Sequence, residues 1–379
     1  MVVATGTVKV TSAPTATGVI SLYIAGERIQ LTVVATDTAA AIATALTAVI
    51  NAKTTLPVTA SAAADTVTLT AKNFGFIGNN IDIRLNYLGF PGGESTPTGM
   101  ELTITAMKGG ASAPDITGAL ANLQDRTFDF IVNPYDDTTS LDAIKAFLSD
   151  VGGRWAWDKQ LYGHSFGTTT GTYAQLGTKG EVRNNQHETL MGVNKSPSPL
   201  GYGLPGTPAL RRSAYVMIRG ALCSHCLSRV LAPALQDRFE ITERNNLLYS
   251  GISTFTVDDD GTVRIENLIT TYQKNSYGDT DDSYLEVETL FSLMFVTRYL
   301  RTAVTSKFGR MKLAANGTRF APVLRSSRRI SSRLTRLRSM ATWCGTGMHR
   351  TRRRLPKISL LSRTPKTRTA SMFCGREPS

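Results

Sequence analysis

The stretch FDFIVNPYDD, Phe128–Asp137, decides the architecture expected for the middle of the chain. Its first five residues are mostly large and apolar, and they predict a buried strand that ends at Asn133-Pro134, because proline cannot continue a sheet ladder. Ser140 follows at the position of an N-cap for a helix over Leu141–Val151. The apolar face of this helix is expected to consist of Leu141, Ile144, Phe147 and Leu148.

Strands and helices alternate along the chain after this unit. Two more strands are expected at Lys159–Tyr162 and Glu188–Met191, and a helix begins between them over Thr172–Leu176. Because such alternation is typical of crossover connections between parallel strands, it predicts an α/β core with a mixed, mainly parallel sheet flanked by helices.

An ordered pattern resumes after residue 230. Ile241–Leu248 is expected to be a helix. The strand patterns Ile252–Val257 and Thr262–Ile265 flank Asp258–Gly261, which predicts a hairpin with a tight turn. Tyr284–Lys307 is a predicted long helix with a broad apolar stripe that needs a packing partner. The stripe consists of Leu285, Val287, Leu290, Phe291, Met294, Phe295 and Leu300.

Residues 1–110 are rich in threonine and poor in charged residues. This composition predicts a β-rich α+β domain of the kind inserted at a protein surface. A hairpin is expected around Ala25-Gly26, and a helix over Thr38–Asn51 capped by Asp37 or Thr36. The other expected features are the helix face Ile42, Leu46 and Ile50, strands at Thr66–Thr70, Ile81–Leu85 and Leu102–Ala106, and a loop at Pro91-Gly92-Gly93.

The positive charge is concentrated in the C-terminal tail. The chain has 42 Lys and Arg against 29 Asp and Glu, a formal charge of +13. Residues 323–379 hold fifteen of these basic residues and one acid, Glu377, so the first 322 residues are close to neutral. Because charge of one sign opposes compaction, residues 323–379 are expected to form a disordered basic tail. The expected domains are 1–110 (β-rich surface domain), 111–322 (α/β core, irregular at 201–229) and 323–379 (tail).

The composition also excludes several classes of protein. The longest alanine-rich apolar stretch, Thr38–Ile50, is broken by threonines and is too short to span a bilayer. The N-terminal MVVATGTVKV lacks the basic and apolar regions of a secretory signal. Four cysteines in 379 residues exclude a disulfide scaffold. An integral membrane protein, a collagen-like chain and a fully disordered chain are therefore not expected.

Five stretches of the ordered part resemble the tail sheath protein of Mu-type contractile bacteriophages. They are Gly75–Tyr87, Phe128–Asp137, Arg238–Asn275, Asp282–Arg301 and Lys312–Pro322, of which the last three are the most specific. The resemblance covers about residues 1–198 and 231–322. It implies a structural subunit that polymerises as a helical sleeve around the tail tube and contracts to drive the tube through the host envelope, with no enzyme activity and no cofactor.

The resemblance also implies partners and a location. The partners are further copies of the chain, the tail tube protein, and the baseplate and tail terminator proteins, with no membrane and no specific nucleic acid among them. The location is the virion tail, and the bacterial host cytoplasm during assembly. In this family terminal arms add strands to the sheets of neighbouring subunits. The family carries more chain before the unit at residue 1, so this sequence is expected to be truncated at its N-terminus.

Residues 201–229 and 323–379 depart from the resemblance and lack a sustained hydrophobic period. When permitted codons for Arg338–Ser379 are shifted by two nucleotides, the translation contains NPNRVDVLWP near its end, and this segment resembles the C-terminal end of the sheath family. The same shift over Gly203–Arg229 gives an ordinary-looking sequence. Both segments are therefore expected to be out-of-frame translations.

An α/β-hydrolase is the main enzymatic alternative. The motif GHSFG, Gly163–Gly167, fits the G-x-S-x-G nucleophile elbow, with Ser165 as the nucleophile after a strand. Thr168–Gly171 disfavours the helix that should begin at the serine, and His187 follows with no convincing acid between the two. A strand end entering a loop is the preferred interpretation.

Three acidic or sulfur-containing motifs are weighed against metal binding. Cys223–Cys226, CSHC, has no second ligand pair at zinc spacing. Asp258–Gly261 lacks the glutamate that closes a calcium-binding loop, so a hairpin turn is preferred. Asp136-Asp137 near Asp142 is expected to be a loop followed by a helix start. No catalytic, cofactor-binding or metal residue is therefore assigned.

Nucleic-acid binding through the tail is the remaining alternative. Trp343 and Phe373 are the only aromatic residues of the tail, so it lacks the interleaved aromatics that stack on bases. We expect such a tail to bind polyanions weakly and without sequence choice.

Overall fold

The structure is a computed structural model of the chain, and it describes residues 2–198, 226–227, 230–314 and 326–328. Residues 1–294 form one compact unit, and residues 295–379 belong to a second. Helices and strands are mixed along the chain and the strands form several sheets, which confirms the mixed α/β class.

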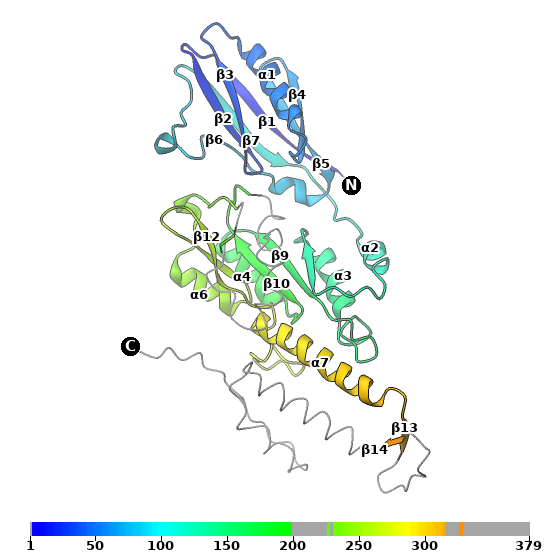
Figure 1. Cartoon of the computed structure of the whole chain (residues 1–379). Helices are drawn as coiled ribbons and strands as arrows, with labels where there is room; N and C mark the ends of the chain where they lie inside the picture. Colours follow the sequence, from blue (N-terminus) through cyan, green and yellow to red (C-terminus); the bar gives the residue numbers. More distant parts are fainter. Residues whose placement is uncertain (1, 199–225, 228–229, 315–325, 329–379) are drawn as a thin grey trace. The chain divides into compact units, whose positions relative to one another are not determined.

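Two sheets and one helix make up the N-terminal part of the first unit (Figure 1). The four-stranded antiparallel sheet has the order β4-β5-β1-β7, and the three-stranded antiparallel sheet has the order β3-β2-β6. The bounds are β1 Val3–Ser12, β2 Gly18–Ile24, β3 Glu27–Val33, α1 Ala39–Ala52, β4 Val58–Ala63, β5 Thr66–Phe74, β6 Ile83–Leu85 and β7 Glu101–Lys108. Two 3-10 turns accompany them, η1 Phe76–Asn80 and η2 Phe90–Gly92, and the second overlaps the expected loop at Pro91–Gly93.

The expected hairpin, helix and three strands of this part are confirmed. The hairpin turns at Ala25 and Gly26, whose φ angles of 54° and 78° both lie in the left-handed region. A two-residue turn of this kind matches the twist of the paired strands. β1 and β4 were not predicted, because glycine, alanine and serine residues in these strands weaken the alternation of apolar and polar side chains.

Helix α1 is capped by a residue other than those predicted. The Thr38 hydroxyl accepts a hydrogen bond from the Ala41 amide at 3.2 Å, so Thr38 is the N-cap. Asp37 instead accepts from the Val34 amide at 2.8 Å. The prediction of Asp37 or Thr36 is therefore wrong, because the Asp37 carboxylate closes the turn before the helix. The buried face of α1 is confirmed as Ile42, Leu46 and Ile50.

A parallel three-stranded sheet organises the middle of the unit. Its order is β10-β9-β8, with β8 at Phe130–Asn133, β9 at His164–Thr170 and β10 at Glu188–Val193. The helices around these strands are α2 Thr117–Ala121, α3 Thr138–Leu148 and α4 Tyr173–Val182. The parallel order confirms the mainly parallel α/β layer expected from the sequence.

Two details of this layer differ from the prediction. No strand forms at Lys159–Tyr162, because Gln160 and Tyr162 have φ angles of 52° and 59° that interrupt an extended chain. Ser140 is not the cap of α3. Asp137 caps this helix by accepting a hydrogen bond from the Ser140 amide at 2.8 Å, so the helix begins at Thr138 and ends at Leu148.

The parallel sheet is covered on both faces. On one face, Leu190 packs with Leu141 of α3, Leu176 of α4 and Leu247 of α6, which spans Ile241–Tyr249. On the other face, β9 and β10 pack against the β11–β12 hairpin and the start of α7. The principal residues on this second face are Phe166, Met191, Phe255, Val263, Phe291 and Met294. The result is a three-layer core.

The C-terminal elements agree with the expected pattern. β11 Thr254–Val257 and β12 Val263–Asn267 form the predicted antiparallel hairpin, after the 3-10 turn η5 Leu235–Asp237. α7 spans Val287–Phe308, three residues shorter at its start than predicted. Up to Met294 its stripe is buried, with Leu290 at 1% and Phe291 at 4% exposure, so the predicted helix does find a packing partner.

The second unit continues from Phe295. It contains the rest of α7 and a parallel strand pair, β13 Lys312–Ala314 and β14 Ser326–Arg328. β14 lies inside the segment expected to be disordered, and most of residues 323–379 lies outside the described residues. The same holds for most of the irregular segment 201–229. In the part that is described, no helix is long and apolar enough to cross a membrane.

Candidate functional site

The GHSFG motif is part of the parallel sheet and forms no elbow. Ser165 is the second residue of β9, lies between Ile131 and Glu188 in the sheet register, and is 1% exposed. A nucleophile elbow needs its serine on a strained turn with an accessible hydroxyl. The preferred interpretation, a strand end entering a loop, is also wrong, because residues 164–170 are the strand itself. The threonines that disfavour a helix after Ser165 favour a strand.

His164 is a structural residue of the sheet interior. Its Nε2 lies 2.8 Å from the Thr189 Oγ1, and its ring packs against Phe166 and Phe291 at centroid distances of 4.8 and 6.0 Å. Burial, followed by the nearby His187, lowers the pKa of His164 well below its usual value. The imidazole is therefore neutral at pH 7.

His187 is held by an acid and an aromatic ring. Its Nε2 lies 3.0 Å from the Asp150 Oδ1, and its ring stacks on Trp155 at 4.3 Å between centroids. The hydrogen bond to His187 lowers the pKa of Asp150. The Ser165 amide donates to the backbone oxygen of His187 at 2.9 Å. The sequence-predicted pair of Ser165 and His187 is thus brought together through the backbone, with both residues buried.

A buried ion pair joins α4 to β10. Arg183 donates two hydrogen bonds to Glu188, at 3.1 and 2.8 Å, and a third to Asp142 at 2.6 Å. The side chain of Glu188 is fully buried and that of Arg183 is 7% exposed, whereas Asp142 is 60% exposed. The Thr271 hydroxyl donates to the Asn185 carbonyl at 3.1 Å and lies 3.3 Å from Glu188. These donors replace the water that the Glu188 carboxylate loses on burial.

Gln273 ties three chain segments together. Its side-chain amide donates to the Gly180 carbonyl of α4 at 2.8 Å and to the Ser250 carbonyl after α6 at 3.0 Å. Its backbone amide donates to the Asn184 side chain at 2.9 Å. Gln273 lies in the stretch Arg238–Asn275, and its side chain satisfies backbone carbonyls at the ends of two helices.

The acidic motifs serve turns and caps. The Asp258–Gly261 segment forms the expected hairpin turn, in which the Asp258 amide donates to the Thr262 carbonyl at 2.9 Å and Gly261 has a φ of 83°. Asp136 pairs with Lys179 at 3.2 Å and Asp137 caps α3, which confirms a loop followed by a helix start. Among the described residues, no group of three or more His, Cys, Asp or Glu side chains is placed to hold a metal ion.

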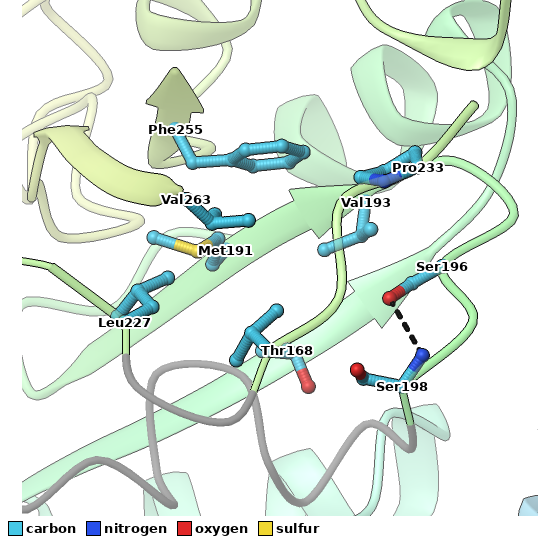
Figure 2. Close-up of a pocket in the computed structure, with 10 residues that line it drawn as sticks. Thr168, Met191, Val193, Ser196, Ser198, Leu227, Pro233, Phe255 and Val263 are labelled. Atoms are coloured by element: carbon cyan, nitrogen blue, oxygen red, sulfur yellow. Dashed lines mark hydrogen bonds between the residues drawn. The ribbon is translucent and has the colours of Figure 1, made fainter. Parts of the chain in front are cut away.

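A cavity inside the α/β core is small and mostly apolar. It has a volume of about 20 Å³ and lies between β9, β10 and the β11–β12 hairpin (Figure 2). Met191, Val193, Phe255 and Val263 line it, with Ser198 at the rim, where the Ser198 amide donates to the Ser196 hydroxyl at 3.2 Å. Ligand pockets measure roughly 300–1,000 Å³, so this cavity has room for about one water molecule.

The CSHC motif is described only at its last residue. Cys226 is exposed, and its backbone forms an isolated antiparallel β-bridge with Arg264 of β12. Cys223–His225 lie outside the described residues.

The polar side chains that join the helices to the sheet were not predicted from the sequence. We call them the polar core, and they are Arg183, Asn184, Glu188 and Gln273. None of them lies in a motif with a fixed spacing. The one available signal is the placement of Arg183 and Glu188 at the two ends of the loop from α4 to β10.

Ser165, His164, His187, Arg183 and Glu188 are buried in an α/β domain, where the ion pair and hydrogen bonds described above hold the sheet and its helices together. In sequence, residues 109–271 match the family described as the phage tail sheath protein central domain. The chain is also 38% identical over 319 residues to the Mu-like prophage FluMu tail sheath protein of Haemophilus influenzae. The chain is therefore similar in sequence to phage tail sheath proteins, as its sequence motifs indicated.

The matches cover only part of the length of each related protein. The aligned part covers 84% of this chain and 64% of the Haemophilus protein, so the chain spans about 64% of the length of that relative. Two solved structures are similar at a lower level. The sheath tail protein of Desulfitobacterium hafniense has 14% identity over 88% of this chain and 71% of its own, with a TM-score of 0.39. The contracted helical sheath of the anti-feeding prophage has 13% identity over 66% and 62%, with a TM-score of 0.38. At these TM-scores neither likeness carries an argument.

Proposed function

We propose that this chain is a structural subunit of a contractile phage tail sheath. In this function it polymerises as a helical sleeve around a tail tube and contracts to drive the tube through the host envelope. The observation that carries the proposal is the 38% identity to a Mu-like tail sheath protein over 319 residues. The match of residues 109–271 to the sheath central domain supports it from the part of the chain that holds Arg183, Asn184 and Glu188 of the polar core.

The construction of the core suits this function. A sleeve that contracts rotates its subunits as near-rigid bodies, so each subunit must keep its internal geometry while its contacts with neighbours change. The buried pair of Arg183 and Glu188 and the contacts of Gln273 join helices to the sheet by directional bonds. Such bonds fix one arrangement of the layers more strictly than apolar packing does.

The proposed partners are further copies of the chain, the tail tube protein, and the baseplate and tail terminator proteins, with no membrane and no specific nucleic acid. The proposed location is the phage tail, and the host cytoplasm during assembly. Strand β8 supports contacts between copies, because it stands at the edge of the parallel sheet with β9 as its one neighbour there. An edge strand can accept a strand from another subunit.

The proposed organisation has three parts. Residues 1–110 form a β-rich surface domain, residues 111–322 form the sheath core, and residues 323–379 form a basic tail; most of 201–229 and of 323–379 lies outside the described residues. Two apolar clusters that lie wholly between Ala4 and Met107 support the first boundary. The charge of residues 323–379 supports the third part.

Electron microscopy with negative stain tests the proposed function. A chimaera in which the Haemophilus relative supplies the residues outside the matched 319 should form regular sleeves when it is produced with the tail tube protein of that relative. The chain alone should form few sleeves, because residues 323–379 are expected to be an out-of-frame translation of the family's C-terminal end. A chimaera that folds but forms no sleeves, with or without the tube protein, would refute the proposal.

The enzymatic alternative is not supported by the comparisons. Ser165→Ala should leave the fold unchanged, and a fluorophosphonate probe should not label Ser165 in the folded chain, because that side chain is 1% exposed. Mass spectrometry of the probe-treated protein checks this. A probe adduct on Ser165 under native conditions would revive the hydrolase hypothesis.

A further inference from the structure

The segment Lys159–Tyr162 has a sequence typical of a strand, yet it is held out of the parallel sheet. It directly precedes Gly163 and β9, and Gln160 and Tyr162 have φ angles of 52° and 59°. A positive φ is rare for a bulky side chain such as that of Tyr162, which is 4% exposed, and it persists only where neighbouring contacts enforce it. The bend before β9 is therefore a strained element of the fold.

The β8–β9 ladder indicates where this segment would lie if it were extended. Phe130 of β8 stands opposite His164 of β9, and the His164 amide donates to the Asp129 carbonyl at 2.9 Å. Because a parallel ladder repeats every two residues, the next pair toward the N-terminus would be Phe128 opposite Tyr162. In that register both the amide and the carbonyl of Tyr162 would bond to the segment before β8.

Arg154 takes both of these backbone groups of Tyr162. Its carbonyl accepts from the Tyr162 amide at 3.2 Å, and its Nε donates to the Tyr162 carbonyl at 3.0 Å. The Arg154 carbonyl also accepts from the Leu161 amide at 3.0 Å. Bonds to Arg154 thus stand in place of the bonds that would lengthen the ladder.

The same arginine binds the segment that would be the partner in a longer ladder. Its guanidinium donates to the Gln124 carbonyl at 3.2 Å and to the Arg126 carbonyl at 2.6 Å. It also lies 4.1 Å from the centre of the Phe128 ring. Arg154 is 3% exposed, so a buried cation bridges the two segments that an extended ladder would join directly.

We propose that Arg154 keeps Lys159–Tyr162 as a latent strand, which means a segment that can join the sheet when the arginine releases it. In the bent arrangement the segment is bonded to Arg154. In the extended arrangement it continues β9 toward the N-terminus and pairs with residues 126–129. Each arrangement satisfies the backbone groups of Tyr162 with different partners, so the two can be close in free energy. Both arrangements belong to a single copy of the chain and do not depend on the proposed sheath function.

Hydrogen exchange measured by mass spectrometry on the full chain distinguishes release of the segment from simple loosening. Arg154→Met removes the guanidinium donors and keeps an apolar stem. Peptides covering residues 124–131 should then exchange at least about threefold more slowly than in the unaltered chain, because the amides of Thr127 and Asp129 become donors of the longer ladder. Faster exchange in both 124–131 and 154–163 would show that Arg154 only braces the loop, and would overturn the inference.

Two variants at position 160 test the latent strand without changing Arg154. Gln160→Gly favours the left-handed backbone of the bent arrangement, whereas Gln160→Val disfavours it. Both remove the bond from the Gln160 side chain to the Trp157 carbonyl, so that bond does not distinguish them. Residues 124–131 should exchange about fivefold more slowly in Gln160→Val than in Gln160→Gly. Equal exchange in these two variants would overturn the inference even if Arg154→Met fails to fold.

Ala64 provides the matched control for backbone strain. It has a φ of 52° in the turn between β4 and β5, so Ala64→Val and Ala64→Gly change the backbone preference there in the same way. The two Ala64 variants should differ by less than about twofold in the exchange of residues 124–131. A difference as large as that between the Gln160 variants would assign the effect to strain in general, and the latent strand would be rejected.

Discussion

The N-terminal β-rich part and the parallel-sheet part of the first unit are stabilised in different ways. Between residues 2 and 108 the buried side chains are apolar except for Ser21 and Glu94. All other buried polar and charged residues in the described part lie between Asn133 and Thr271. The first part has an ordinary hydrophobic core. The second part combines a hydrophobic core with the buried polar and charged residues between Asn133 and Thr271, which we call the polar lattice.

This difference coincides with the family match. Residues 109–271, which match the sheath central domain, include every member of the polar lattice. Apolar packing tolerates substitutions of similar volume, whereas a buried polar group must keep its specific partners. The polar lattice is therefore the part of the molecule in which sequence and geometry constrain each other most tightly.

The largest expected effect comes from breaking the buried ion pair. Glu188→Ala leaves the charge of Arg183 buried without its main partner, and it should lower the free energy of unfolding by about 3–5 kcal/mol. Urea denaturation followed by circular dichroism measures the loss. Asp142→Ala removes the exposed partner of the same arginine and should cost below about 1 kcal/mol. Equal losses in the two variants would show that burial does not govern this network.

A buried and an exposed residue of helix α1 allow a matched comparison within the N-terminal part. Leu46 of α1 is 1% exposed in the N-terminal core, and Leu46→Ala should cost about 2–4 kcal/mol through lost burial and the cavity it leaves. Thr44→Ala, at an exposed position of the same helix, should change stability by at most about 0.5 kcal/mol. Hydrogen exchange should locate the effect of Leu46→Ala within residues 2–108. Equal loss of protection around β9 and β10 would show that the two parts unfold as one.

The same contrast explains what could be predicted from the sequence. The hairpin at Ala25-Gly26, the face of α1 and the parallel order of the sheet follow from hydrophobic periodicity and turn chemistry, which are local properties. The ends of elements were predicted less well. Asp137 rather than Ser140 caps α3, because either side chain can act as a cap and only the local backbone decides.

The polar lattice could not be predicted from local pattern. Glu188 was assigned to a strand, and nothing near it indicates that its carboxylate meets Arg183, Thr271 and, through Arg183, Asp142. These contacts join residues up to 83 positions apart, and their energy depends on burial that the sequence does not display. The location of β9 was missed for a related reason, since Arg154 organises the preceding loop through backbone carbonyls.

Acid should weaken the parallel-sheet part before the N-terminal part. Burial, followed by the nearby His187, lowers the pKa of His164 well below its usual value. Below about pH 6.5 the unfolded state therefore binds a proton at His164 more readily than the folded state does. Its contribution to stability is complete above the unfolded pKa of about 6.5 and is lost as the pH falls below it, by up to about 1.4 kcal/mol per pH unit. Asp150, whose pKa is also lowered, adds a further loss below about pH 4.

Urea denaturation between pH 7.5 and pH 5.5 measures this dependence. His164→Gln keeps a hydrogen-bonding side chain opposite Thr189 but cannot titrate, so it should be less stable at pH 7.5 and should show a flatter pH profile. Chemical denaturation with a probe in the N-terminal part, such as Tyr23 fluorescence, should show little change over this range. A pH profile of His164→Gln as steep as that of the unaltered chain would contradict the assignment.

The smallest expected effect concerns the cap of α1 in the N-terminal part. Thr38 satisfies the Ala41 amide through its hydroxyl, so Thr38→Ala should lower the free energy of unfolding by about 1 kcal/mol. Thr36→Ala, two residues earlier, removes a hydroxyl that is exposed and outside the cap, and it should stay within about 0.5 kcal/mol. The two variants delete the same atoms and differ only in position relative to the helix end. Paired denaturation curves therefore isolate the cap itself, and equal losses would indicate that the first turn of α1 is held by the packing of Ile42 and Leu46 rather than by its capping hydrogen bond.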